Sequence, residues 1–173
     1  MKETTRLNTR QIALSGLLTA MMLVLGYVET LIPISVGVPG IKLGLSNGLL
    51  IFAIYMLGAK VSLVLMALKV VLSGLLFGGV SAMAFSLAGG VVSVTAMILL
   101  KRAGGLSPVV VSMVGGAAHN VAQVALAMLI LETTKLVYYM AVLLLVGLGM
   151  GAVTGIAAAA VLRHMARIGG RTT

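Results

Sequence analysis

The chain has 173 residues, of which 61% are hydrophobic and only 9% are charged. This composition, with a mean hydropathy of +1.22, indicates an integral membrane protein rather than a soluble domain. The net charge of +9 indicates loops and tails that face anionic lipid, and we expect no nucleic-acid partner. The absence of Cys excludes disulfides and thiolate catalysis, and two His without acidic neighbours argue against a zinc site.

Acidic residues are the scarcest charged type. The chain has no Asp, and its three Glu are Glu3, Glu29 and Glu132. Magnesium bound to a diphosphate is normally held by one or two protein carboxylates. We therefore expect no catalytic residue, no metal site and no cofactor, which favours a binding or carrier protein over an enzyme.

Charged residues and Gly/Pro breaks divide the chain into six apolar segments. Their ranges are 11–32, 45–57, 61–77, 80–100, 107–131 and 136–162. A span needs about 20 apolar residues, and the first segment is too long for the core of a signal peptide. The pattern predicts a single all-α membrane domain over residues 1–173 with six transmembrane helices.

The basic residues indicate the orientation of these helices. Placing the N-terminus in the cytoplasm puts nine Lys and Arg inside and two outside, which agrees with the positive-inside rule. The inner set is Lys2, Arg6, Arg10, Lys60, Lys101, Arg102, Arg163, Arg167 and Arg171, and the outer set is Lys42 and Lys135. We expect both termini to be cytoplasmic.

The second segment, residues 45–57, is too short to cross the bilayer unaided. Its 13 residues give about 20 Å of helix, against a hydrocarbon core of about 30 Å. The preceding stretch, Pro33–Gly44, contains two Pro and three Gly. Irregular backbone at membrane depth is tolerated where it is buried or lines a cavity, so this stretch forms either a lid folded into the outer mouth or an ordinary loop.

Two groups of polar residues lie near the middle of their spans. Lys69 is nine residues beyond Lys60, and His119, Asn120 and Gln123 share one region of the fifth span. A lysine at this depth normally faces the bundle interior or a wet cavity. These residues predict a pocket in which Lys69 either supplies positive charge to an anionic ligand or stays neutral. The alternatives are that Lys69 extends to an interface and that the other three form a structural hydrogen-bond knot.

A third polar group opens the second segment. Lys42, Ser46 and Asn47 lie where a helix N-terminus would present free N–H groups and a partial positive charge. The group suits an anionic ligand, or alternatively anchors the chain to lipid headgroups.

Small residues recur every fourth position in two spans. This spacing lets helix backbones approach closely, either within the bundle or against the membrane helices of a partner. The residues are Gly147, Gly151, Gly155 and Ala159 in the last span, and Gly16 and Ala20 in the first. We predict that Gly16 and Ala20 form a partner-docking face.

Three motifs carry a resemblance to a known family. They are the segment Pro39–Asn47 (Pro-Gly-Ile-Lys-Leu-Gly-Leu-Ser-Asn), the segment Ser86–Gly90, and His119-Asn120 with Gln123. Together they resemble the bacterial Gx transporter family, which is labelled heptaprenyl diphosphate synthase component I. The chain is also similar to the substrate-binding S components of energy-coupling factor (ECF) transporters.

The resemblance implies a multi-pass protein of the bacterial plasma membrane with an S-component-like bundle. Such a protein would bind a small molecule and pass it inward with an ECF coupling protein and ATPases, since the chain has no phosphate-binding Gly-x-x-x-x-Gly-Lys-Ser/Thr motif of its own. A second hypothesis is a non-catalytic membrane subunit beside a soluble prenyl synthase in quinone synthesis. A third is a proton-coupled carrier that uses His119 and Glu29.

Overall fold

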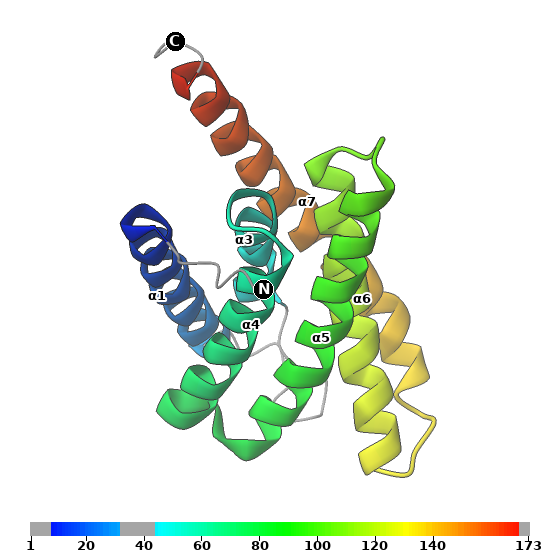
Figure 1. Ribbon diagram of the computed structural model, residues 1–173. Helices are drawn as coiled ribbons and strands as arrows, with labels where there is room; N and C mark the ends of the chain where they lie inside the picture. Colours follow the sequence, from blue (N-terminus) through cyan, green and yellow to red (C-terminus); the bar gives the residue numbers. More distant parts are fainter. Residues whose placement is uncertain (1–7, 32–43, 170–173) are drawn as a thin grey trace, which may run out of the picture.

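The computed structural model describes residues 8–31 and 44–169, which form helices joined by short turns, with no strand among them (Figure 1). The elements are α1 (Thr9–Leu31), α2 (Leu45–Gly48), α3 (Leu50–Met56), α4 (Ala59–Ser73), the π-helical segment η1 (Gly74–Gly78), α5 (Gly79–Ala103), α6 (Pro108–Ile130) and α7 (Val137–Gly169). The all-helical prediction is confirmed. Lys42 and most of the stretch Pro33–Gly44, where a lid or a loop was expected, lie outside the described residues.

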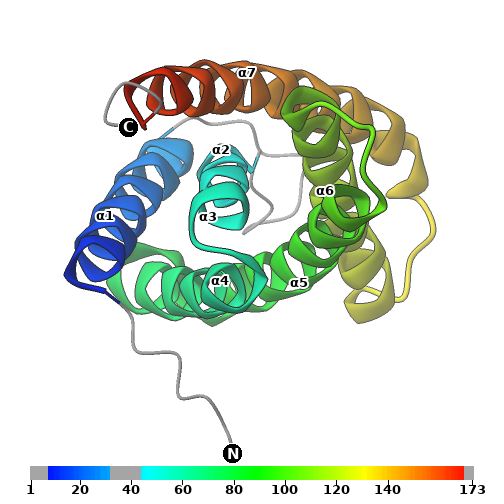
Figure 2. The ribbon, with the colours of Figure 1, turned by 45° about the horizontal axis from the view of Figure 1, so that its top comes forward.

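The short helices α2 and α3 lie at the centre of the bundle, surrounded by α1, α4, α5, α6 and α7 (Figure 2). Every side chain from Leu49 to Ile54 is buried, which is possible only for a segment with neighbours on all sides. Fully buried side chains on other helices, among them Met22 of α1 and Val94 of α5, belong to the same core cluster. The second apolar segment of the sequence is therefore the core of the fold.

Four helical stretches are long and apolar enough to cross a membrane: Thr9–Leu31, Ala59–Ala103, Pro108–Ile130 and Val137–Arg167. The second of them has 45 residues and doubles back near Gly79, so that α4 and α5 run side by side (Figure 1). Gly79 has φ +71°, which a side chain would disfavour. The helices thus agree with a multi-pass membrane protein.

Glycines bring α6 and α7 into backbone contact. A Cβ on Gly116 would collide with the carbonyl of Gly147, and one on Gly151 would collide with the backbone of Ser112 and Met113. The small-residue stripe of the last span therefore serves packing within the bundle, as the first of its two interpretations stated.

Local signals set several helix ends. Ser107 caps α6 by accepting a hydrogen bond from the Val110 N–H, and Pro108 follows at the first helical position. At the end of α3, the Lys101 ammonium donates to the Ile54 carbonyl at 2.7 Å and lies 4.6 Å from the centre of the Tyr55 ring. A cation from α5 thus completes the C-terminus of the central helix.

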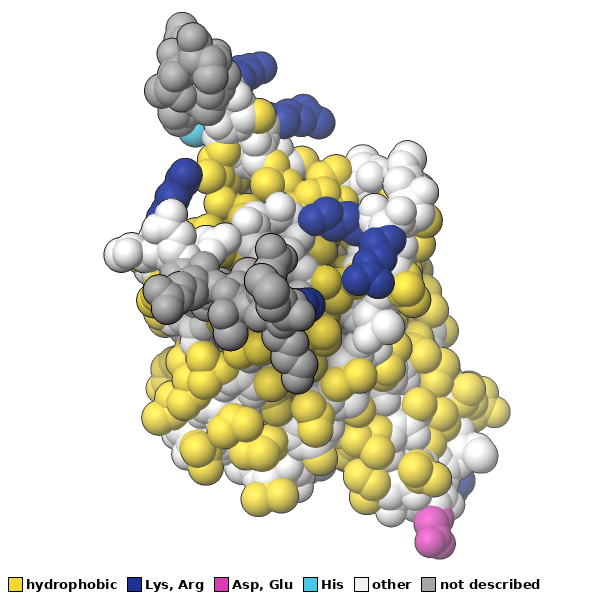
Figure 3. Space-filling model, viewed as in Figure 1, with side chains coloured by type: hydrophobic (Ala, Val, Ile, Leu, Met, Phe, Trp, Pro, Cys, Tyr) yellow, Lys and Arg dark blue, Asp and Glu magenta, His cyan; other side chains and the backbone are white. Residues whose placement is uncertain are grey.

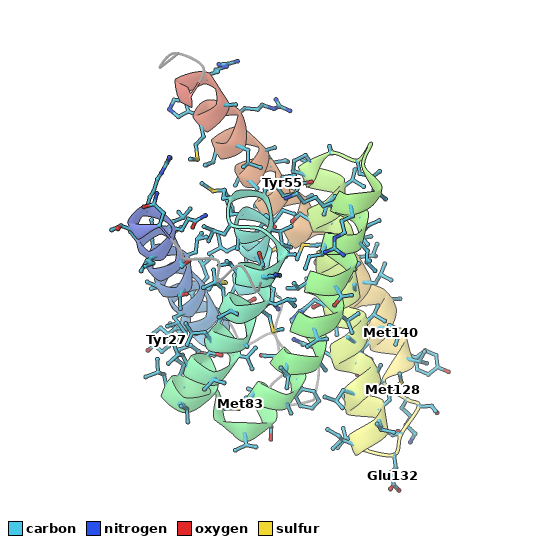
Figure 4. All side chains as sticks on the ribbon, viewed as in Figure 1. Tyr27, Tyr55, Met83, Met128, Glu132 and Met140 are labelled. Atoms are coloured by element: carbon cyan, nitrogen blue, oxygen red, sulfur yellow. The ribbon has the colours of Figure 1, made fainter. Side chains whose placement is uncertain are left out.

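Basic residues gather at one end of the molecule. Figure 3 shows Lys and Arg side chains around the end where α1 begins and α7 finishes, whereas an acidic side chain marks the opposite end. That acidic residue is Glu132, in the turn between α6 and α7, which Figure 4 places far from Tyr55 at the basic end. The described part of the chain is therefore polarised along the axis of the bundle.

Candidate ligand-binding site

The site begins where the chain enters α2. Gly44 precedes this helix with φ +88°, in the left-handed region that favours glycine. The Glu29 carboxylate of α1 accepts hydrogen bonds from the Leu45 N–H and from the Ser46 hydroxyl, the latter at 3.1 Å. Glu29 is only 6% exposed, so this pair of bonds ties α1 to the start of α2 inside the protein.

Four side chains from three helices form a continuous polar cluster, made of Asn47, Lys69, His119 and Gln123. The Lys69 ammonium donates to Asn47 Oδ1 at 2.9 Å, and Asn47 Nδ2 lies 2.7 and 2.8 Å from the two ring nitrogens of His119. Gln123 Nε2 contacts His119 Nε2 from the next turn of α6. The polar cluster joins α2, α4 and α6 at the centre of the bundle.

The polar cluster is almost completely removed from solvent, since none of its four side chains is more than 3% exposed. The ring of His119 also hydrogen-bonds to the Gly89 backbone. A neutral imidazole that donates to this backbone can accept from an amide through its other nitrogen. The cluster therefore combines the Lys69 amine with two amides and an imidazole, a chemistry suited to an anionic or polar ligand group.

Two glycines hold the His119 ring on opposite sides. A Cβ on Gly44 would lie 3.0 Å from His119 Cδ2, and a Cβ on Gly89 would overlap Cε1 and Nδ1 of the ring. The imidazole is therefore fixed by close backbone approach from both α5 and the entry to α2, in addition to its hydrogen bonds.

Asn120 faces a different neighbour. Its Nδ2 donates to the Leu143 carbonyl of α7 at 2.7 Å, while its Oδ1 is buried and has no hydrogen-bond partner among the described residues. Asn120 thus forms an interhelical hydrogen bond of the kind expected from a structural hydrogen-bond knot. His119 and Gln123 instead belong to the polar cluster that contains Lys69. Its role as a ligand residue remains a prediction.

The other residues of the sequence hypothesis are dispersed. Ser46 is buried against Glu29, Lys42 is outside the described residues, and Gly16 and Ala20 lie on the exposed surface of α1. A Cβ on Gly16 would meet nothing within 4 Å. The face of Gly16 and Ala20 is therefore not used for packing within the described bundle, and docking remains the open prediction for it.

Sequence reasoning left several residues out of the site. Glu29 was considered only for a proton-coupled carrier, and the contact of Ser112 with Thr154, at 3.0 Å between hydroxyls, was not foreseen. These hydroxyls line a cavity of about 10 Å³ that also reaches Asn47, enough for about one water molecule. A signal for Ser112 exists in the sequence, because Ser112-x-x-Gly115-Gly116 repeats the spacing of Ser86-x-x-Gly89-Gly90. This spacing indicates close helix packing but not polarity at the centre.

Comparison with known proteins identifies the family. A family model described as heptaprenyl diphosphate synthase component I matches residues 18–161. The chain belongs to this family. The match covers α1 from Leu18 onward and most of α7, so it includes all four residues of the polar cluster. Searches of curated proteins and of solved structures found no significant match.

Proposed function

We propose that this member of the component I family binds a small anionic or amphipathic molecule at the polar cluster within the membrane, and that partner proteins energise its transport in the manner of an S component. The observation that carries this proposal is the buried Lys69 ammonium, held at the centre of an apolar bundle by Asn47. A lysine at membrane depth costs at least a few kcal/mol, and such residues usually mark a substrate or ion pathway.

The proposed arrangement in the membrane has six crossings with both termini in the cytoplasm of a bacterial cell. In this orientation the basic end of the molecule faces the anionic inner leaflet. The N-terminus of α2, where Glu29 and Ser46 meet, then faces the outside and leads toward Lys69. A ligand that enters from outside reaches the polar cluster through this region.

A second function is favoured by the family description, which names a component of a prenyl diphosphate synthase. In this role the chain is a non-catalytic membrane subunit beside a soluble synthase, since a chain without Asp has few ligands for magnesium diphosphate. The polar cluster would then recognise the diphosphate of an isoprenoid, with its tail among the apolar helices.

Native mass spectrometry of the detergent-purified protein tests the proposal by identifying the molecule that co-purifies. Lys69→Ala and Gln123→Leu should each weaken binding of that molecule by about tenfold, or about 1.4 kcal/mol. Lys60→Met removes one exposed positive charge from the same helix and should leave affinity unchanged. Equal affinities of Lys69→Met and the original protein would contradict the role of Lys69, and recovery of a bound prenyl diphosphate together with a soluble synthase would favour the second function.

A further inference from the structure

An apolar groove runs along the side of the bundle, away from the polar cluster. It has a volume of about 510 Å³ and is bounded by α1, α3 and α7. The groove exists because α1 packs against α2 and α4, whereas α7 packs against α6, α2 and α3, so that within the described residues α1 and α7 do not pack along each other. Its lining comes mainly from Ala13, Leu17 and Met21 of α1, Phe52 and Met56 of α3, and Val161 of α7.

One end of the groove is basic. Arg10 is the charged residue of its lining, and a second cavity of about 380 Å³ adjoins it and adds Asn8 and Gln11. Arg163 and Arg167 are exposed on the last turns of α7, near in sequence to Leu162 of the second cavity and to Met165, which lines both. Among the described residues, both glutamates lie elsewhere: Glu29 near the end of α1, where it bonds the start of α2, and Glu132 in the turn after α6.

The length of the groove limits what can occupy it. From Arg10 to Met21 is a rise of 11 residues, or about 16 Å of helix. This is about half of the 30 Å hydrocarbon core. A transmembrane helix of a partner must cross the whole core, whereas the acyl chain of a lipid extends over one leaflet.

We propose that this groove binds an anionic phospholipid of the adjacent leaflet, with an acyl chain along Ala13–Met21 and the phosphate headgroup at Arg10. Two features support this occupant: the groove is apolar to mid-membrane depth, and its basic end complements a phosphate. The inference goes beyond the proposed function, because the groove shares no residue with the polar cluster. A lipid seated here fills the space between α1 and α7 and adds contacts that α1 otherwise lacks.

The absence of Trp from the chain allows a direct test. Leu17→Trp places one fluorophore in the groove, and Val64→Trp places one on the outer face of α4; these positions are 57% and 64% exposed. Each protein is reconstituted in phosphatidylcholine bilayers. One series contains increasing mole fractions of brominated phosphatidylglycerol, and the other contains increasing mole fractions of brominated phosphatidylcholine. Brominated acyl chains quench Trp fluorescence on contact. For Leu17→Trp, brominated phosphatidylglycerol should reach half-quenching at a mole fraction about threefold lower than brominated phosphatidylcholine.

The controls separate this lipid from other occupants. Val64→Trp should be quenched equally by both lipids, and Arg10→Gln added to Leu17→Trp should remove the preference. Equal quenching of Leu17→Trp by the two lipids would overturn the proposal, as would a preference that survives Arg10→Gln. A fluorophore that neither lipid quenches would show that a second copy or another protein covers the groove, which also overturns it. Ala13→Trp, at another exposed groove position, repeats the test if Leu17→Trp does not fold.

Discussion

At the scale of single residues, the sequence grouped polar residues that the structure brings together, but it did not predict the contact that links them. Counting along the spans placed Lys69 near His119 and Gln123, and the structure joins them. The link is Asn47, which lies 22 and 72 positions away from Lys69 and His119 and was assigned to a separate site at a helix N-terminus. Helical periodicity determines which face a residue occupies, but contacts between distant segments depend on how the helices pack, so this link could not be predicted.

The fixed position of His119 gives a prediction about its glycine neighbour. Gly89→Ala should destabilise the protein by about 1–3 kcal/mol, because the added methyl group overlaps the imidazole and the His119 carbonyl. Gly16→Ala makes the same change where nothing lies within 4 Å and should be neutral or stabilising by up to about 1 kcal/mol. The thermal stability of both variants is measured by heating and then following the remaining monomer by size-exclusion chromatography. Similar losses of stability in the two variants would show that the His119 ring does not restrict position 89.

At the scale of helices, apolar length and charge located the elements well. The segments expected at 45–57, 107–131 and 136–162 correspond to α2 with α3, α6, and most of α7. The break between α2 and α3 was not predicted. It occurs where Gly48 lies against the Thr154 side chain, so close that a Cβ would collide with it. The π-helical segment Gly74–Gly78 was also not predicted, since neither feature alters the apolar pattern.

The end of α3 provides a prediction for Lys101. Lys101→Met keeps the apolar stem but leaves the Ile54 carbonyl without its cationic donor, so stability should fall by about 1 kcal/mol. Arg102→Met removes a charge from the neighbouring exposed position and should cost less than about 0.5 kcal/mol. The same thermal assay compares them, and equal stability of the two variants would contradict the capping role.

The exposed face of α1 gives a prediction about partners. Ala20→Leu should abolish assembly with a coupling protein, because a large side chain prevents close helix approach. Ligand binding to the isolated protein should survive, since the polar cluster lies on other helices. Ala84→Leu changes an alanine that is also exposed, on α5, and serves as the control. A partner pull-down measures assembly, and a binding assay on the purified variant measures ligand affinity. If Ala20→Leu loses both assembly and ligand binding, or keeps both, the docking face is contradicted.

At the scale of the whole molecule, charge patterning predicted what the fold displays, with basic residues concentrated at one end (Figure 3). The assignment of that end to the cytoplasm rests on the positive-inside rule. The number of crossings rests on the length of the apolar segments. The family, in turn, was recognised from short motifs around Asn47, Gly89 and His119. These are the positions where glycine and polar side chains meet in the structure, at the His119 ring.

The absence of Cys makes the orientation testable by labelling. Lys60→Cys, in the first turn of α4, should resist a membrane-impermeant thiol reagent in intact cells. Thr133→Cys, in the turn between α6 and α7, should react. Lys60 is exposed at the beginning of α4 and Thr133 lies between two helices, and permeabilised cells provide the control in which both should label. Reaction at Lys60→Cys without permeabilisation would overturn the orientation with both termini inside.

The central position of α2 and α3 has a consequence for biosynthesis. The 12-residue helix Leu45–Met56 is about 18 Å long and carries buried Ser46 and Asn47, so it is a poor substrate for independent insertion by the translocon. Its neighbours include α6 and α7, which the ribosome completes last. The innermost helix of the protein is thus among the first to be synthesised, and we expect it to be among the last to reach its final place in the bundle.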